Sequence, residues 1–293
     1  MAIESFVDGF GVEVFTSWWP VDAPSAVVVI AHGASEHALR YERFAGELNA
    51  AGIAVVAIDH RGHGRTGASP GAGLVGPGGG PVLIEDLHEV RLQAETRFPN
   101  VPLIVFGHSL GSLITLAYLV EHSRGLAGGV LCGFAADIDA TDAMGELLSG
   151  FAELRDESAA AILAAINAPF EPARTPFDWL SRDDAEVDAY INDPYCGDNN
   201  PITFGYLIDV FDVVAPAATQ LSTIECPVFV IAGDQDPAAG TGAFATGVAD
   251  ALRDASVAVD LKLYEGARHE LLNETNRVEV TADLVEWVLR QAE

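Results

Sequence analysis

A serine lies between two glycines at the point where an apolar run ends: residues 103–111 read LIVFGHSLG. Such a short apolar run is typical of a strand that is buried on both faces, and a helical pattern follows over residues 109–122. A strand-to-helix turn this tight strains the serine backbone and needs glycine at both flanks to make room for the neighbouring chain. We therefore expect the hydroxyl of Ser109 to be pushed out above a buried sheet.

Apolar runs and helical patterns alternate along most of the chain. This alternation predicts an α/β fold with a mostly parallel sheet and helices on both faces. Residues 5–19 differ, because two β-rich runs around Gly9 and Gly11 predict a hairpin. The other strands are expected within residues 26–33, 53–64, 103–106, 128–133, 226–237 and 257–270, and helices at about residues 41–51, 82–98, 109–122, 241–253 and 276–291.

The alternation breaks between residues 134 and 215. This stretch has helical segments, three prolines within residues 169–176 and no clear buried strand. We therefore expect a core domain made of residues 1–133 and 216–293, into which residues 134–215 are inserted as a helical cap. A dense cluster of glycine and proline at residues 65–81 predicts an exposed loop.

The acidic side chains bear on the class of partner. The chain has 43 acidic residues against 15 lysines and arginines, a formal net charge of −28. This charge repels phosphate backbones, so we expect no nucleic-acid partner. Because the acidic residues are scattered, we interpret the charge as serving solubility and not as recruiting a substrate.

Two further features bear on location. No apolar run reaches the roughly 18–20 residues of a membrane-spanning helix, and the first residues lack the pattern of a secretory signal. We therefore expect a cytoplasmic location without stable membrane insertion.

Cys132, Cys196 and Cys226 are widely spaced, which predicts reduced thiols. Because the chain has no C-x-x-C pair, a zinc or redox site has little support. The sequence leaves the oligomeric state open.

A serine hydroxyl becomes a good nucleophile only beside a base, and the base needs an acid to orient it. On a sheet of this kind the chain order is serine, acid, histidine. His269 is the only histidine after His122, so we predict it to be the base. Asp234 and Asp236 both follow the preceding strand. We predict Asp236 to be the acid because it lies further out, whereas Asp234 would brace the loop.

The tetrahedral intermediate of acyl transfer carries an oxyanion, which two preorganised N–H donors stabilise. We predict these donors to be the backbone amides of Leu110, directly after the serine, and of Ala34, where Gly33 lets the loop approach closely. His32 is expected to bond to loop backbone, and His108 to pack beside the nucleophile or to donate a hydrogen bond to the residues around it. This chemistry needs neither a metal nor an organic cofactor, so we expect none.

One helical stripe in the insert is a candidate for substrate binding. Phe204, Leu207, Ile208 and Phe211 are spaced so that they share one apolar helix face. The stripe can pack on the core, or it can form a pocket wall for an acyl or aryl group. Both interpretations hold together if the stripe covers the serine.

Five motifs in the chain occur in the order and spacing of a known family: HGASEHALRY (32–41), DHRGHGRTG (59–67), GHSLGS (107–112), GDQDP (233–237) and YEGARHELLNE (264–274). With them the chain resembles the monoacylglycerol lipase and lysophospholipase branch of the α/β-hydrolase superfamily, over nearly its whole length outside the insert. The resemblance implies an eight-stranded, mostly parallel sheet, a helical cap over the active site, and hydrolysis of acyl esters of glycerol or similar alcohols. It assigns a Ser109–His269–Asp236 triad and an oxyanion hole at Ala34 and Leu110.

The predicted function is therefore hydrolysis of a small-molecule carboxylic ester through an acyl-enzyme. Serine at position 109 counts against epoxide hydrolases and haloalkane dehalogenases, which would have aspartate there. Because the insert aligns poorly, a short-chain or aromatic carboxylesterase, for example of the phthalate type, stays open. So do a thioesterase, a perhydrolase, a C–C hydrolase, an acyltransferase and a ligand receptor, since fold alone does not fix function.

Overall fold

The computed structural model describes the backbone of residues 1–293 and every side chain except that of Leu163. An eight-stranded sheet has the order β1-β2-β4-β3-β5-β6-β7-β8. Its strands are β1 (Ala2–Val7), β2 (Glu13–Trp19), β3 (Ala26–Ala31), β4 (Ile53–Ile58), β5 (Leu103–His108), β6 (Gly128–Cys132), β7 (Val228–Gly233) and β8 (Val259–Tyr264). Strands β3 to β8 are parallel, and β2 is antiparallel to both of its neighbours. The predicted α/β fold with an eight-stranded, mostly parallel sheet is confirmed.

The apolar runs of the sequence form the middle of this sheet. Every residue of β3, β4, β5 and β7 is buried, as expected of parallel strands whose two faces are both covered. At the two edges, the residues of β1 and β8 are exposed or half-buried, apart from the buried Tyr264 at the end of β8. The predicted hairpin joins β1 to β2, with Val7 opposite Glu13 and Gly11 at a positive φ of 83° in the turn.

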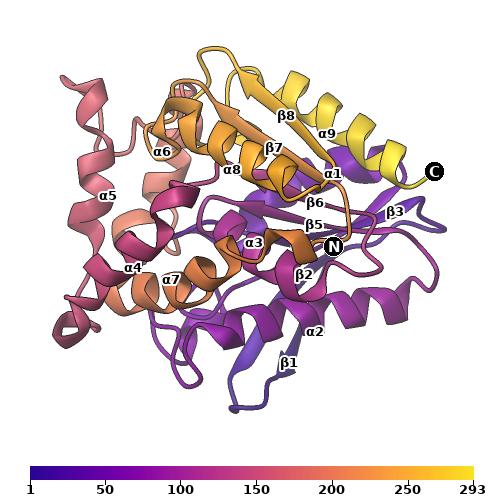
Figure 1. Cartoon of the computed structure of the whole chain (residues 1–293), viewed down its shortest axis with the longest axis horizontal. Helices are drawn as coiled ribbons and strands as arrows, with labels where there is room; N and C mark the ends of the chain where they lie inside the picture. The colour runs from indigo at the N-terminus through magenta and orange to yellow at the C-terminus, as the bar shows by residue number, and fades with distance from the viewer.

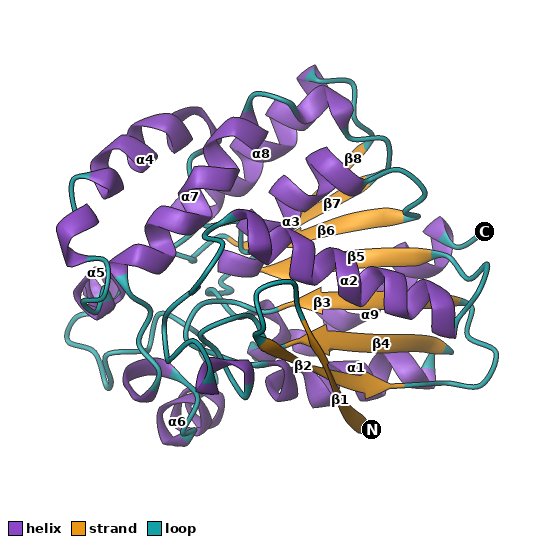
Figure 2. Ribbon diagram, turned by 90° about the horizontal axis from the view of Figure 1, so that it is seen from below, coloured by secondary structure: helices purple, strands orange, loops and turns teal.

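Helices pack on both faces of the sheet (Figure 2), namely α1 (Glu42–Ala50), α2 (Pro81–Arg97), α3 (Leu110–His122), α8 (Ala243–Asp254) and α9 (Arg277–Gln291). One hydrophobic cluster joins the sheet to α1 and α9, and a second joins its other face to α2, α3 and α8. The last helix buries one face, which includes Val280, Leu284, Trp287 and Val288. None of the described helices has the length and apolarity needed to cross a bilayer.

The chain between β6 and β7 is helical and contains α4 (Thr141–Ser149), α5 (Ala160–Ile166), α6 (Asp184–Asn192) and α7 (Phe204–Ala218). Figures 1 and 2 show α4, α5 and α6 gathered at one end of the sheet, away from the C-terminus. Helix α7 continues three residues past the predicted boundary at residue 215. The division into a core and a cap stays a prediction, and this helix is the element that would connect the two.

The glycine-rich loop at residues 65–81 is less exposed than its composition predicts, and that expectation was wrong in part. Gly73 is buried and Val75 is only 2% exposed. The carbonyl of Gly73 accepts hydrogen bonds from the amide and the hydroxyl of Thr203, directly before α7. A side chain at Gly73 would collide with the carbonyl oxygen of Pro201. The glycine therefore serves close packing against the insert, which composition alone does not reveal.

Candidate active site

Ser109 occupies a strained turn between β5 and α3. Its φ of 54° and ψ of −120° lie in a region that residues other than glycine rarely adopt. Helix α3 begins at the next residue, so the positive end of its dipole lies beside the serine. The backbone thus has the strained strand-to-helix geometry that the sequence predicts at this serine.

The two glycines around Ser109 are explained by close packing. A Cβ atom at Gly107 would collide with the carbonyl oxygen of Gly111 and the hydroxyl of Thr115. A Cβ atom at Gly111 would collide with the carbonyl oxygen of Ala31, at the end of β3. Glycine at both positions therefore lets α3 start directly against the neighbouring strands.

Asp236 and His269 come from the loops after β7 and β8, and the structure brings them together. Nδ1 of His269 lies 2.7 Å from Oδ2 of Asp236, and the residues are 2% and 0% exposed. The other carboxylate oxygen of Asp236 accepts hydrogen bonds from two backbone amides that follow in the loop. Asp234, the alternative acid, instead accepts a hydrogen bond of 2.8 Å from the amide of Gly266. It braces the loop and does not contact the imidazole.

Ser109 and His269 line the same cavity. Among the described residues no hydrogen bond joins the serine hydroxyl to the imidazole, and the Nε2 atom of His269 has no hydrogen-bond partner. Catalytic hydrogen bonds are often long in free enzymes and tighten only when substrate binds. The imidazole packs against the rings of Trp179 and His108, whose centroids lie 4.9 Å and 4.8 Å away.

Ala34 and Leu110, the predicted oxyanion donors, also line this cavity. Within the described part of the chain, neither backbone amide donates a hydrogen bond. The adjacent amide of Gly33 is occupied, since it donates to Oε1 of Glu36 at 2.5 Å. His32 bonds to loop backbone as expected, with Nδ1 at 2.7 Å from the carbonyl oxygen of Gly33. Two backbone donors beside the serine are therefore free to meet a ligand.

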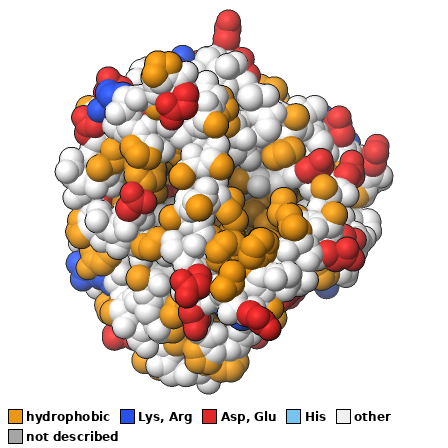
Figure 3. Space-filling model, turned by 90° about the vertical axis from the view of Figure 1, so that its left-hand side faces the viewer, with side chains coloured by type: hydrophobic (Ala, Val, Ile, Leu, Met, Phe, Trp, Pro, Cys, Tyr) orange, Lys and Arg blue, Asp and Glu red, His pale blue; other side chains and the backbone are white. Residues whose placement is uncertain are grey.

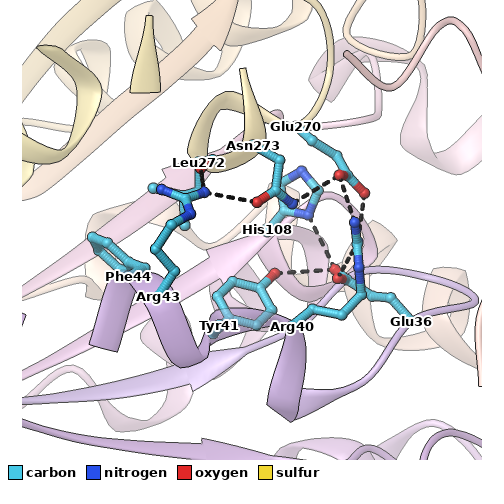
Figure 4. Close-up of a pocket in the computed structure, with 9 residues that line it drawn as sticks. All are labelled: Glu36, Arg40, Tyr41, Arg43, Phe44, His108, Glu270, Leu272 and Asn273. Atoms are coloured by element: carbon cyan, nitrogen blue, oxygen red, sulfur yellow. Dashed lines mark hydrogen bonds and ion pairs between the residues drawn. The ribbon is translucent and has the colours of Figure 1, made fainter. Parts of the chain in front are cut away.

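A buried network of charges links the two loops of the site (Figure 4). Arg40 donates one hydrogen bond of 2.9 Å to Glu36 and two, of 2.6 Å and 2.8 Å, to Glu270. The hydroxyl of Tyr41 donates to Glu36 at 3.0 Å. Because Glu270 directly follows His269 and Glu36 lies in the loop after β3, Arg40 holds the loop of the predicted base against the loop of the predicted oxyanion donors.

His108 adds a second link between these loops. Its Nδ1 lies 3.2 Å from Oε1 of Glu36, and its Nε2 lies 3.3 Å from the carbonyl oxygen of His269. Burial lowers the pKa of His108, but the hydrogen bond and charge of Glu36 outweigh burial and raise it. Burial raises the pKa of Glu36, but His108 and Arg40 outweigh it and hold this pKa well below its usual range. A protonated His108 donates at both nitrogens at once, as this geometry requires.

The cavity has an empty volume of about 1050 Å³, its open mouth included. Its apolar wall comes mainly from the helices of the insert, through Met144, Leu148, Ile162, Ile166, Leu207 and Phe211. Figure 3 views the molecule from the side of these helices and shows hydrophobic side chains around a hollow, with acidic groups further out. Glu36, His108, Tyr190 and Glu270 also line it. They lie close together, because Arg40 bonds to both glutamates and stacks on Tyr190, and His108 contacts Glu36. The cavity is therefore divided into an apolar part and a smaller polar part.

The four residues of the predicted stripe on α7 lie in different surroundings. Leu207 and Phe211 line the cavity, whereas Ile208 is buried in the hydrophobic core. Phe204 stacks on Phe151 with ring centroids 4.8 Å apart. Phe211 also belongs to the hydrophobic core, so lining the cavity and packing on the core occur together on this helix face. A role of these residues in substrate binding stays a prediction.

Several residues of the site were missed in the sequence. Glu36 and Arg40 stand four residues apart inside HGASEHALRY, and Glu270 directly follows the predicted base. The signal in the sequence was that these charged residues lie close to predicted catalytic groups. The sequence does not reveal that they are buried together. Trp179 and Tyr190 lie in the insert without a recognisable motif, so only the structure places them in the cavity.

A sheet of this order with a serine at a strained strand-to-helix turn is the architecture of an α/β hydrolase. Comparison with known families agrees: the chain belongs to the family described as Serine aminopeptidase, S33, which matches residues 22–276. The monoacylglycerol lipase of Mycolicibacterium smegmatis is 32% identical over 279 residues, which cover 94% of this chain and 92% of the relative. The monoglyceride lipase of Rattus norvegicus is 28% identical, over 96% of this chain and 88% of its own.

Among solved structures, a thermostable carboxyl esterase from Bacillus coagulans, in complex with glycerol, matches with a TM-score of 0.90. It is 28% identical, and the match covers 100% of both chains. The resemblance to the monoacylglycerol lipase branch is thereby confirmed. By homology the protein is a hydrolase of the esterase and lipase type, related to monoglyceride lipases.

Proposed function

We propose that the protein hydrolyses monoacylglycerol-like carboxylic esters through an acyl-enzyme formed on Ser109. One observation carries this proposal: the buried pair of Asp236 and His269 opens onto the same cavity as the strained serine. Nucleophile, base and orienting acid are the parts that acyl transfer by serine needs.

In the first step His269 takes the hydroxyl proton while Ser109 attacks the ester carbonyl carbon. Asp236 holds the imidazole through Nδ1 and stabilises its positive form. The tetrahedral intermediate collapses, and His269 gives the proton to the departing alcohol. Water then enters, loses a proton to His269 and attacks the acyl-enzyme. His269 returns this proton to the serine oxygen as the acid leaves, which restores the serine hydroxyl and the neutral imidazole.

The free amides of Ala34 and Leu110 are the proposed oxyanion hole. Backbone N–H groups that are already in place stabilise the charge that develops on the carbonyl oxygen without reorganising. The amide of Gly33 is excluded from this role because it donates to Glu36. Glu36 instead fixes the conformation of the loop, so that the next amide is left for the substrate.

The division of the cavity supports an ester with a long apolar acyl group and a polar alcohol. Aliphatic side chains from α4, α5 and α7 suit an acyl chain. Tyr190 and Glu270, in the polar part, offer partners for alcohol hydroxyl groups. The names of the monoacylglycerol lipase relatives and the glycerol complex of the Bacillus esterase point to the same substrate class.

The test is a comparison of kcat/KM over 1-monoacylglycerols of increasing chain length, p-nitrophenyl esters from acetate upward, and aryl diesters. The proposal predicts multiple turnovers with a maximum among medium- or long-chain glycerides, and their loss in Ser109→Ala. A maximum at acetate or at aryl diesters would instead assign a short-chain or aromatic carboxylesterase. A single turnover with every ester would contradict an enzyme and favour a ligand receptor.

A further inference from the structure

Three side chains of metal-binding types meet where the insert contacts the loop after β3. Nε2 of His37 lies 3.0 Å from Oδ2 of Asp193. The thiol sulfur of Cys196 completes the group, and the three atoms all lie within 4.8 Å of one another. His37 comes from the loop after β3, whereas the other two follow α6, so the group joins segments that are remote in the sequence.

The backbone presents two of these side chains from one tight turn. The amide of Cys196 donates a hydrogen bond of 3.2 Å to the carbonyl oxygen of Asp193. The second carboxylate oxygen of Asp193 accepts from the amide of Tyr195 at 2.8 Å, which leaves the first directed to His37. Ligands three residues apart on such a turn are the arrangement that C-x-x-C gives in zinc sites, here with aspartate in the first position.

We propose that His37, Asp193 and Cys196 bind a Zn²⁺ ion, with water in the fourth position. A thiolate, an imidazole and a carboxylate are all ligands that Zn²⁺ takes in proteins. Tetrahedral bonds of about 2.0–2.3 Å require ligand atoms roughly 3.3–3.8 Å apart. The separations of up to 4.8 Å therefore close by about 1 Å when the ion binds. The thiol gives up its proton to solvent in this step.

The surroundings favour a divalent cation and leave it a route of entry. Asp193 adds a third carboxylate to the nearby Glu36 and Glu270, whose charges also act on Cys196. The guanidinium of Arg40 lies beside this group and already donates to both glutamates. The side chain of Asp193 is 27% exposed. An ion therefore reaches the buried sulfur past this carboxylate.

Zinc bound here would join the insert to the loop of the active site. His37 stands three residues after Ala34, and Tyr190 of the cavity stands three residues before Asp193. An ion that pulls the two segments together restrains both the predicted oxyanion loop and the wall of the cavity.

The binding test uses the chelator-treated full-length chain and Cd²⁺, whose bond to a thiolate gives an ultraviolet charge-transfer band. We expect the band to saturate at one Cd²⁺ per chain and to be abolished by competing Zn²⁺. Cys196→Ser removes the band, and the matched variant Cys226→Ser, at a buried cysteine elsewhere in the core, keeps it. A band that survives in Cys196→Ser, disappears in Cys226→Ser or never saturates overturns the proposal.

A second pair of variants tests the proposed site without changing Cys196. Asp193→Asn and His37→Gln keep the approximate shape of the side chains but remove a ligand. Calorimetric titration with Zn²⁺ is expected to show affinity at least about tenfold weaker in each. Zn²⁺ is also expected to raise the melting temperature of the unmodified protein and not that of His37→Gln. Equal affinity in all three proteins would overturn the assignment of ligands, whether or not Cys196→Ser folds.

Discussion

Nδ1 of His269 donates a hydrogen bond of 2.7 Å to Oδ2 of Asp236, and both side chains are almost completely buried. An ionised carboxylate only accepts, so it fixes the proton of the imidazole on Nδ1 and leaves Nε2 as the basic atom. This nitrogen belongs to a side chain that lines the cavity together with Ser109. This is the arrangement that the proposed role of His269 as a base requires.

Replacing Asp236 by Asn tests this relationship. The amide keeps the shape of the carboxylate but can turn its NH₂ group toward Nδ1, which favours the wrong tautomer. We expect kcat for p-nitrophenyl esters to fall by about 10⁴, with unchanged circular dichroism. Asp234→Asn is the matched control, because its carboxylate braces the loop through Gly266. A rate for Asp236→Asn within about tenfold of the unmodified protein would contradict the assignment.

The close approach of α3 to β3 predicts a large effect of one added methyl group. Gly111→Ala would push a Cβ atom into the carbonyl oxygen of Ala31. We expect the free energy of unfolding in urea to fall by more than about 2 kcal/mol. Gly46→Ala is the control, since this exposed helical glycine has open space around its Cβ position. The free energy of unfolding of Gly46→Ala should rise by about 0.5–1 kcal/mol. Equal changes in this free energy for Gly111→Ala and Gly46→Ala would contradict the packing explanation.

Buried histidines beneath the site predict loss of stability in acid. Burial and the nearby His63 lower the pKa of His60 to about 3, and burial lowers the pKa of His63 to about 4. Unfolded histidine has a pKa near 6.5, so the unfolded chain binds more protons as the pH falls below that value. Each such histidine then lowers the free energy of unfolding by about 1.4 kcal/mol for every pH unit by which the pH falls.

His60→Phe isolates one of these contributions. Both ring nitrogens of His60 are buried without a hydrogen-bond partner among the described residues, so phenylalanine removes a proton-binding group without breaking a bond. Urea unfolding between about pH 6 and pH 4 should show a shallower loss of stability in the variant, by about 1.4 kcal/mol per pH unit. Parallel profiles for the two proteins would show that His60 does not take up a proton on unfolding.

The sequence predicts those parts of the fold that depend on local pattern. Short apolar runs and the glycines around Ser109 predict the buried strands and the strained turn, because the geometry of each depends on neighbouring residues. The burial of Gly73 and Val75 was not predicted, since it depends on contact with the insert more than a hundred residues later. Long-range packing of this kind leaves little trace in local composition.

The same limit applies to the site. The order of serine, acid and histidine along the chain predicted Asp236 and His269 as partners, and the structure pairs Asp236, not Asp234, with His269. The catalytic roles of the three residues stay a prediction. The network of Glu36, Arg40 and Glu270 was not predicted, because charged residues are usually exposed and only the structure shows these to be buried together. The sequence also left open which residues of the α7 stripe line the cavity and which pack against other side chains.

The wall of the cavity predicts a change in chain-length preference. Leu207 on α7 lines the cavity, so Leu207→Trp should occupy space needed by a long acyl chain. We expect kcat/KM for long-chain esters to fall at least about tenfold relative to short-chain esters. Phe204→Leu is the control on the same helix, because Phe204 stacks on Phe151. An unchanged ratio in Leu207→Trp would remove this residue from the acyl site.

The central claim is that Ser109 attacks the substrate, and the most direct measurement is mass spectrometry after reaction with a fluorophosphonate. This reagent traps an activated serine as a stable adduct. The account predicts one adduct per chain, on the peptide that contains Ser109, formed in proportion to the loss of esterase activity and much more slowly in Asp236→Asn. Complete inactivation with the adduct on another residue, or full activity with Ser109 modified, would contradict it.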